Sequence, residues 1–321
     1  MCRQEGMKMK KLWLGILLLI SCVWFAMPFQ AASLKKVSLY DANYKESKPV
    51  KVGSYYYRVT QAPNPENTDA GAKMYYERSK KKKSGYTRLV TVKGYADIYY
   101  TNGKQIFYIS PKARALYKYD LKQKKSKRIT KLGAKSQYTS YSFHGAFGSK
   151  LYVMSFNIRH KLNKLICYNV KTGKKSTVLE NQVVWNSAAD TGRYLFLTEG
   201  TDFVDKNGSF TGADGRPHRF YVYDKKTQET WDVTEDGYAG MSYAAGGGDY
   251  GKLGNFGVYA VYDAGADRWE IYKYTFSSRE RKQIGEINQA GEKFGMMWAG
   301  KKIFVSYQNT SGEDKNVQLD L

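Results

Sequence analysis

The chain has 321 residues, of which 42% are hydrophobic, and this composition excludes a disordered protein and allows a packed core. Its formal net charge of +23 is far more than solubility requires and predicts attraction to polyanions. A generally basic surface with no defined partner explains the same charge equally well. Tyrosine is the outlier, and its 29 residues suit half-buried β-strand faces.

Residues 1–32 are predicted to be an export signal. Three lysines precede the apolar run Leu12–Phe29, and the small residues Ala31 and Ala32 follow it. An uncleaved membrane anchor is one alternative, because the run approaches the length of a spanning helix. A second is lipidation at Cys22, because Leu19–Cys22 looks like a bacterial lipobox.

Residues 33–321 are predicted to form one domain. This part carries +20 of the charge, because residues 1–32 hold four cations and one acid. Its one cysteine, Cys167, allows no internal disulfide.

In this domain a glycine-bearing turn opens six times into an alternating, Tyr-rich strand. The spacings between the glycines are 50, 45, 44, 62 and 46 residues. The glycines are Gly53, Gly103, Gly148, Gly192, Gly254 and Gly300. Such a period, with only strand patterns inside it, is typical of β-propeller blades. The sequence therefore predicts an all-β, six-bladed β-propeller of four-stranded antiparallel blades, or five blades if the first unit is incomplete.

The predicted third strand of each unit alternates aromatic and other residues before a Lys-rich or Thr-rich turn. Examples are Tyr117–Asp120, Ile166–Asn169, Tyr221–Asp224 and Tyr272–Thr275. Alternation places the first and third residue on one face, against a neighbouring blade, and the second on the other. A fourth strand closes each unit.

This repeat resembles the divergent propeller repeats of secreted bacterial proteins. Similar repeats occur in propeller domains like those of the low-density-lipoprotein receptor and in TolB-like and quinoprotein-like proteins. The resemblance covers nearly all of Lys35–Leu321 and implies the fold. Its motif is loose and implies no particular activity.

Two units depart from the repeat. The fourth carries the insertion Thr201–Arg219, and the sixth ends after Asn316–Leu321. Because an open edge strand invites aggregation, Lys36–Tyr40 is predicted to pair with the last unit and close the ring. The alternative makes Lys36–Tyr40 the first strand of the first unit.

Catalytic chemistry has little support in the sequence. His144, His160 and His218 have no Gly-x-Ser-x-Gly elbow beside them, and an ordinary core or surface histidine is the simpler interpretation of each. Four acids on or beside first and second strands could cleave sugars at a channel mouth, but linear spacing does not bring any two together. They are Asp97, Asp190, Glu199 and Asp249.

No metal or cofactor is predicted. One cysteine and scattered histidines cannot form a zinc site. The loop with Asp202, Asp205, Asn207 and Asp214 has oxygen ligands for calcium but not the spacing of an EF-hand, so a solvated turn is the simpler interpretation.

Binding is the function that the sequence favours, through lysine clusters at equivalent turns of successive units. The candidate binding residues are Arg78, Lys80, Lys81, Lys82, Lys83, Lys124, Lys125, Lys127, Arg128, Lys174 and Lys175. Together they would form a basic arc, whereas solvated turns that prevent aggregation are the simpler alternative. Nucleic acid would suit the charge, but export argues against it.

Aromatic residues near the first strands could instead stack on sugar or peptide, although core packing is the commoner role. They are Tyr99, Tyr100, Tyr138, Tyr141, Phe143, Trp185, Tyr243, Tyr250 and Trp298. The sequence thus predicts a secreted or cell-surface monomer without enzymatic activity. It would bind an anionic cell-envelope polymer or a protein partner, and would touch the membrane only through an uncleaved or lipidated N-terminus. The alternative is an enzyme that cleaves polysaccharide or peptide at the channel mouth.

Overall fold

The computed structural model describes residues 33–39, 45–62, 71–132, 139–157, 162–181, 184–200, 217–233, 241–244, 256–263, 265–288, 290–299 and 302–320. All the elements named within these ranges are β-strands, which confirms the all-β prediction. The predicted signal segment and most of the predicted insertion lie outside the described residues.

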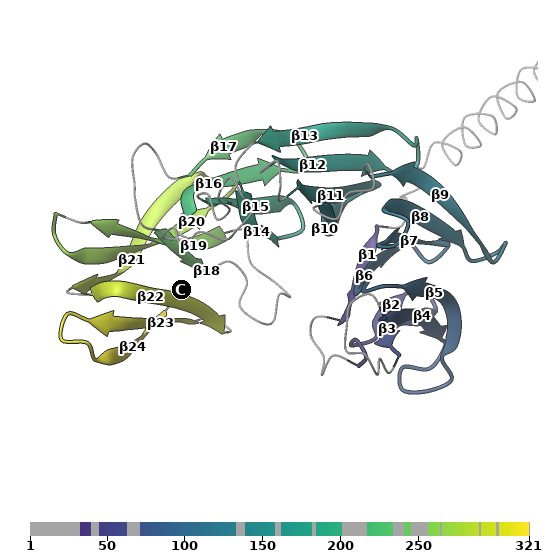
Figure 1. Cartoon of the computed structure of the whole chain (residues 1–321), viewed down its shortest axis with the longest axis horizontal. Coiled ribbons are helices and arrows are strands. Elements are labelled where there is room, and N and C mark those ends of the chain that lie inside the picture. Colours follow the sequence, from purple (N-terminus) through teal and green to yellow (C-terminus); the bar gives the residue numbers. More distant parts are fainter. Residues whose placement is uncertain are drawn as a thin grey trace, which may run out of the picture. The chain divides into compact units, whose positions relative to one another are not determined.

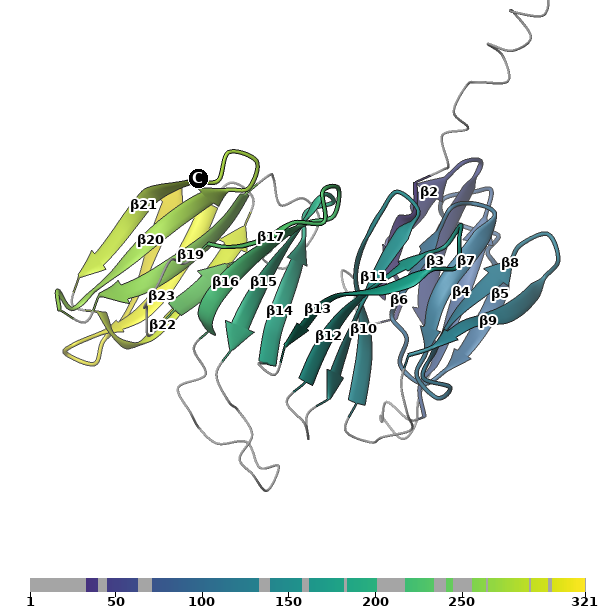
Figure 2. The same ribbon diagram turned by 90° about the horizontal axis from the view of Figure 1, so that it is seen from above.

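The strands form six antiparallel sheets, which we number in chain order (Figures 1 and 2). Sheet 1 contains β2 (Val50–Val52), β3 (Tyr55–Gln61), β4 (Lys73–Ser79) and β5 (Thr87–Lys93). Sheet 2 contains β1 (Lys35–Ser38), β6 (Ile98–Thr101), β7 (Gln105–Ser110), β8 (Ala115–Asp120) and β9 (Lys125–Lys131). Sheet 3 contains β10 (Thr139–Phe147), β11 (Lys150–Asn157), β12 (Leu162–Asn169) and β13 (Lys175–Asn181).

Sheet 4 contains β14 (Val184–Asp190), β15 (Tyr194–Gly200), β16 (Pro217–Asp224) and β17 (Thr230–Asp232). Sheet 5 contains β18 (Met241–Ala244), β19 (Phe256–Asp263), β20 (Arg268–Thr275) and β21 (Glu280–Asn288). Sheet 6 contains β22 (Ala290–Ala299), β23 (Lys302–Asn309) and β24 (Asp314–Asp320). The predicted four-stranded antiparallel unit is therefore present.

The four glycine turns that the structure describes join β2 to β3, β6 to β7, β10 to β11 and β14 to β15, as predicted. The four that the structure describes all have positive φ, where a side chain would be strained. They are Gly53, Gly103, Gly148 and Gly192, with φ of 59°, 82°, 57° and 87°. Gly254 and Gly300 lie outside the described residues.

Alternation along the third strands divides their side chains between two cores, as predicted. In sheet 3, Tyr168 packs into a core shared with sheet 2, whereas Cys167 packs into the core shared with sheet 4. In sheet 4, Tyr223 faces sheet 3 and Val222 faces sheet 5. Each sheet of this kind thus buries both faces, which explains why its strands are rich in large apolar residues.

Five hydrophobic clusters each join two sheets that are consecutive in the chain. Between sheets 5 and 6, for example, Trp269 is 2% exposed and its ring stacks on Phe294 at a centroid distance of 4.2 Å. Burying a large side chain in this way contributes about 1.5–3 kcal/mol. None of these clusters, in the part of the chain that is described, joins sheet 6 to sheet 1.

The N-terminal strand contradicts the predicted closure. β1 pairs antiparallel with β6 in sheet 2, with Val37 opposite Tyr99, and the amide of Leu39 donates to the carbonyl of Asp97 over 2.9 Å. It pairs neither with the last sheet nor with β2, so both predicted partners were wrong. The physical reason is that Val37 and Leu39, both fully buried, join the core between sheets 1 and 2.

Candidate functional site

The first lysine cluster lies on the turn between β4 and β5. The Ser79 hydroxyl donates to the carbonyl of Ser84 over 2.6 Å and accepts the amide of Lys81 over 3.0 Å. The Tyr86 hydroxyl donates to the carbonyl of Lys82 over 2.8 Å. The turn thus satisfies part of its own backbone, and the side chains of Lys80–Lys83 are exposed.

The second cluster lies on the hairpin between β8 and β9, at the equivalent place of sheet 2. The Asp120 carboxylate accepts the amides of Lys122 and Gln123, each over 2.9 Å. The Gln123 amide is the main reason that the pKa of the Asp120 carboxyl is lowered. Lys124 closes the turn with a φ of 54°, in the left-handed region that favours glycine.

The two turns contribute cations to one cavity of about 540 Å³, which we call the cationic cavity. Its basic lining residues are Arg78, Lys80, Lys81, Arg88 and Lys124, and no Asp or Glu is among the residues that line it. The remaining wall is formed by tyrosine, leucine, glycine, serine and threonine. Sequence reasoning found four of these cations but missed Arg88, which lies on β5 outside any lysine run.

Tyrosine rings support the two arginines of this cavity. The Arg78 guanidinium lies 4.6 Å from the centroid of the Tyr55 ring, and that of Arg88 lies 3.4 Å from the centroid of the Tyr75 ring. Within the described residues, no ion pair joins any of the five cations to a carboxylate. Like charges gathered without counter-charges attract an anion from solution.

The other predicted binding residues are exposed but do not line the cationic cavity. Lys82 and Lys83 lie on the same β4–β5 turn, and Lys125, Lys127 and Arg128 lie on β9, the outermost strand of sheet 2. Lys174 and Lys175 belong to the β12–β13 hairpin of sheet 3. That hairpin repeats the turn of sheet 2, because the Asn169 side-chain oxygen accepts the amides of Lys171 and Thr172 over 3.0 and 3.3 Å. The lysine turns therefore lie at equivalent places in sheets 1, 2 and 3. That they form one continuous basic arc stays a prediction.

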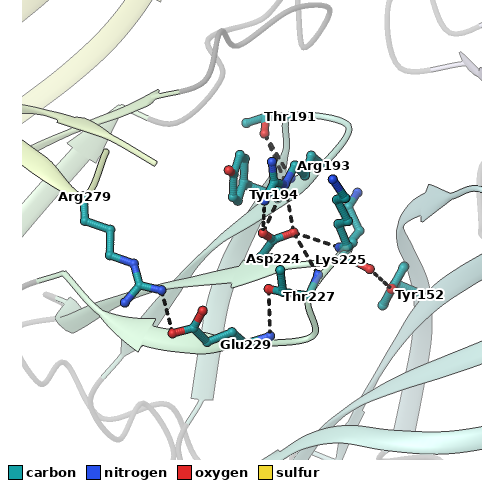
Figure 3. A network of polar contacts seen from close by, with 10 residues as sticks. Tyr152, Thr191, Arg193, Tyr194, Asp224, Lys225, Thr227, Glu229 and Arg279 are labelled. Carbon is teal, nitrogen blue, oxygen red and sulfur yellow. Dashed lines mark hydrogen bonds and ion pairs between the residues drawn. The ribbon is translucent and has the colours of Figure 1, made fainter. Parts of the chain in front are cut away.

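Sheet 4 repeats this turn, because the Asp224 carboxylate accepts the amides of Lys226 and Thr227 over 2.7 and 3.4 Å (Figure 3). The side chain that follows Asp224 differs from the other sheets in a way that sequence reasoning missed. Lys225 is fully buried and its ammonium pairs with the Asp190 carboxylate over 2.5 Å. The equivalent residues of sheets 2 and 3, Leu121 and Val170, are apolar and donate the same backbone hydrogen bond. The sequence did contain a sign of this buried charge, because Lys225 occupies a repeat position that is apolar in sheets 2 and 3.

The predicted catalytic groups do not assemble into a triad among the described residues. His144 and Ser142 hydrogen-bond through Nε2 and Oγ at 2.9 Å, and burial, helped by Lys36, lowers the pKa of His144 to about 4. Of the predicted acids, Asp190 is bound to Lys225, and Asp97 lines a second cavity.

Several predicted candidates cannot be placed. Asp249, Tyr138, Tyr250, His160 and the calcium-loop residues Asp202, Asp205, Asn207 and Asp214 lie outside the described residues. The side chains of His218, Glu199, Trp185, Tyr243 and Trp298 are also outside the description. Of the predicted aromatic residues, Tyr99, Tyr100 and Phe143 are buried and Tyr141 is half-buried. Within the ranges described, no helix has the length and apolarity to cross a membrane.

Neither a known protein family nor a curated protein matches this chain. Among solved structures, an oligogalacturonate lyase from Vibrio parahaemolyticus is 11% identical, with 88% of this chain and 84% of that one covered, at a TM-score of 0.43. TolB from Acinetobacter baumannii is 13% identical, with 83% and 66% covered, at a TM-score of 0.33. A putative TolB from Agrobacterium tumefaciens is 10% identical, with 90% and 98% covered, at 0.39. Similarities this low assign no function to the chain.

Proposed function

We propose that the protein is a non-enzymatic, extracytoplasmic β-propeller that binds an anionic polymer of the cell envelope. The observation that supports this most directly is the cationic cavity, where two hairpins from different sheets contribute five cations and no acid lines the wall. A cavity that already gathers like charges gains electrostatic energy when phosphate or carboxylate groups enter it.

The cavity suits a polymer better than a compact ligand. Positive charge continues outside the cavity on the β4–β5 turn, through Lys82 and Lys83, and on β9, through its exposed cations. A chain with repeated charges can contact these groups together, and each contact releases bound counterions. The affinity should therefore fall steeply as salt concentration rises.

The test compares two triple variants of the full chain, using wall teichoic acid and inorganic polyphosphate as probes. The first is Lys80→Ser, Lys81→Ser and Lys124→Gly. Its matched control is Lys171→Ser, Lys174→Ser and Lys175→Ser, which removes the same charge from the hairpin of sheet 3. Glycine is chosen at Lys124 because the φ of 54° suits it, and Gly173 occupies the equivalent position in sheet 3.

We expect the first variant to lose about tenfold or more in affinity at low salt, and the control to lose much less. Equal losses would contradict the cavity and favour charge spread over all the hairpins. If salt does not weaken binding of either probe, the proposal of a polyanion partner fails.

The extracytoplasmic location rests on the predicted signal at residues 1–32. Mass spectrometry of the native N-terminus separates the three possibilities for it. We expect cleavage near Ala31 or Ala32, whereas a lipid on Cys22 or an intact N-terminus would place the protein at the membrane.

A further inference from the structure

A second cavity, of about 710 Å³, lies between sheets 2 and 3. Its walls are the segment Lys93–Ile98 that joins β5 to β6, the β7–β8 turn with Arg114, and Ser140–Phe143 of β10. This volume falls within the range of small-molecule sites, which is roughly 300–1,000 Å³. We call it the aromatic cavity because the rings of Tyr95, Tyr141 and Phe143 line it.

The wall that joins β5 to β6 is held in place by its neighbours. The Tyr76 hydroxyl donates to the carbonyl of Ala96 over 3.1 Å, and the amide of Gly94 donates to the carbonyl of Ala72 over 2.8 Å. Gly94 has a φ of 89°, and a side chain there would begin 3.2 Å from Pro111. The cavity is thus preformed, so a ligand would not have to order it.

Two tyrosines offer ring surface to this cavity. Tyr95 is 37% exposed, which is unusual for a large aromatic side chain among the described residues, and Tyr141 is half-buried. Burial raises the pKa of Tyr141, and the charge of Arg114, which lines the same cavity, opposes that rise. Aromatic faces beside a cation suit a ligand with an apolar face and an anionic group.

The polar groups that line the cavity limit the chemical class of ligand further. Lys93, Lys112 and Arg114 are basic, whereas Asp97 is a carboxylate that belongs to none of the ion pairs among the described residues. Burial raises the pKa of Asp97, opposed by backbone hydrogen bonding and Lys36. Backbone hydrogen bonding uses only part of the acceptor capacity of this carboxylate, so hydroxyl groups of a ligand can donate to the remaining lone pairs.

We propose that the aromatic cavity binds a sugar unit that carries one anionic substituent. The sugar ring lies against Tyr95 and Tyr141, its hydroxyls donate to Asp97, and Arg114 binds the anionic group. A sugar supplies each of these features in one small molecule. The site shares no residue with the cationic cavity and does not depend on the polymer proposed for it.

Ligand-observed NMR and calorimetric titration of the full chain test this with glucuronate, glucose 6-phosphate and glucose at millimolar concentrations. We expect both anionic sugars to bind more tightly than glucose, and a preference between them identifies carboxylate or phosphate as the substituent. Arg114→Gly should lower the affinity for the anionic sugars about tenfold and leave glucose nearly unchanged. Glycine is suitable because Arg114 has a φ of 46°.

Asp97→Asn and Tyr95→Ser should lower the affinity for all three sugars, because each substitution removes a contact that does not depend on the anionic group. Lys282→Ser is the control, because this lysine is exposed on β21 and lines neither cavity, and it should leave sugar binding unchanged. The proposal is overturned if none of the three sugars binds, or if Arg114→Gly, Asp97→Asn and Tyr95→Ser all retain the original affinities while thermal unfolding shows them folded.

Discussion

Lys225 carries a charge into a position where the other sheets place apolar side chains. Burial lowers the pKa of its ammonium, which the Asp190 carboxylate partly offsets. Space for the pair comes from Gly145 on β10, where a side chain would begin 2.3 Å from an Asp190 oxygen. The Tyr152 hydroxyl, also from sheet 3, donates to the carbonyl of Lys225 over 3.3 Å (Figure 3). One lysine thus joins sheets 3 and 4 by polar contacts in addition to their apolar core.

Removing one partner of this pair should cost more than removing both. We expect Lys225→Ala to lower the free energy of unfolding by about 3 kcal/mol, because Asp190 loses its partner in a largely buried place. The double variant Lys225→Leu with Asp190→Ala should recover much of that loss, since apolar residues occupy the equivalent positions. Urea unfolding of the single and double variants measures this, and additive losses would contradict a coupled pair.

The Asp224 carboxyl should make the free energy of unfolding depend on pH in the acid range. Burial raises the pKa of this carboxyl, but hydrogen bonds from Arg193 and from the amides of Lys226 and Thr227 outweigh it, so the pKa lies below its ordinary value of 3.8. The ionised group therefore stabilises the fold above pH 3.8, and this contribution is lost as the pH falls through the lower, folded-state pKa.

We expect Asp224→Asn to be less stable at neutral pH and to lose stability less steeply below pH 3.8 than the original protein. Urea unfolding across a pH series measures both effects. If the variant loses stability below pH 3.8 as steeply as the original protein, other carboxyls determine the acid dependence.

At the scale of elements, β1 is the strand that the repeat does not explain. It adds a fifth strand to sheet 2 through its register with β6, from Lys35 opposite Thr101 to Ser38 opposite Ile98. β6 has only four residues, so its edge is short, and β1 covers it. An unpaired strand edge is thereby protected within sheet 2.

Val37→Asp tests this pairing. The side chain is fully buried, so an unpaired carboxylate there should lower the free energy of unfolding by at least about 3 kcal/mol. Hydrogen exchange should accelerate first at the amides of β6. Lys35→Ser, at an exposed position of the same strand, is the control. Unchanged exchange at the β6 amides in a folded Val37→Asp variant would contradict the pairing of β1 with β6.

At the scale of the whole molecule, shared cores join the six sheets in chain order. Each sheet that has a neighbour on both sides buries both of its faces, so no single sheet is stable by itself. The same packing is compatible with a closed ring, but closure needs a contact between the first and last sheets. The described residues establish the order of the sheets and their shared cores.

Small-angle X-ray scattering tests ring closure in solution. A compact domain of the length of residues 33–321 has a radius of gyration of about 19 Å. We expect a value near this for the mature protein if the six sheets close into a ring. A clearly larger radius at low concentration and high salt would indicate an open stack of sheets.

Local patterns in the sequence were enough to predict the strands and their turns. Glycine at the first turn, tyrosine alternation on the third strand and Asp or Asn before the hairpin each act within one sheet. They depend on backbone sterics and on the period of a strand, which neighbours in the chain determine. The equivalent positions of the lysine turns follow from the same register.

The contacts between sheets depended on tertiary structure. Arg88 joins the cationic cavity although it lies outside any lysine run, and β1 pairs with β6 rather than with the last sheet. Lys225 is buried because Asp190 and Gly145 lie beside it, one of them on another sheet. Residues far apart in sequence meet only when sheets pack, and packing depends on the shape and charge of both faces, which a repeat period does not encode.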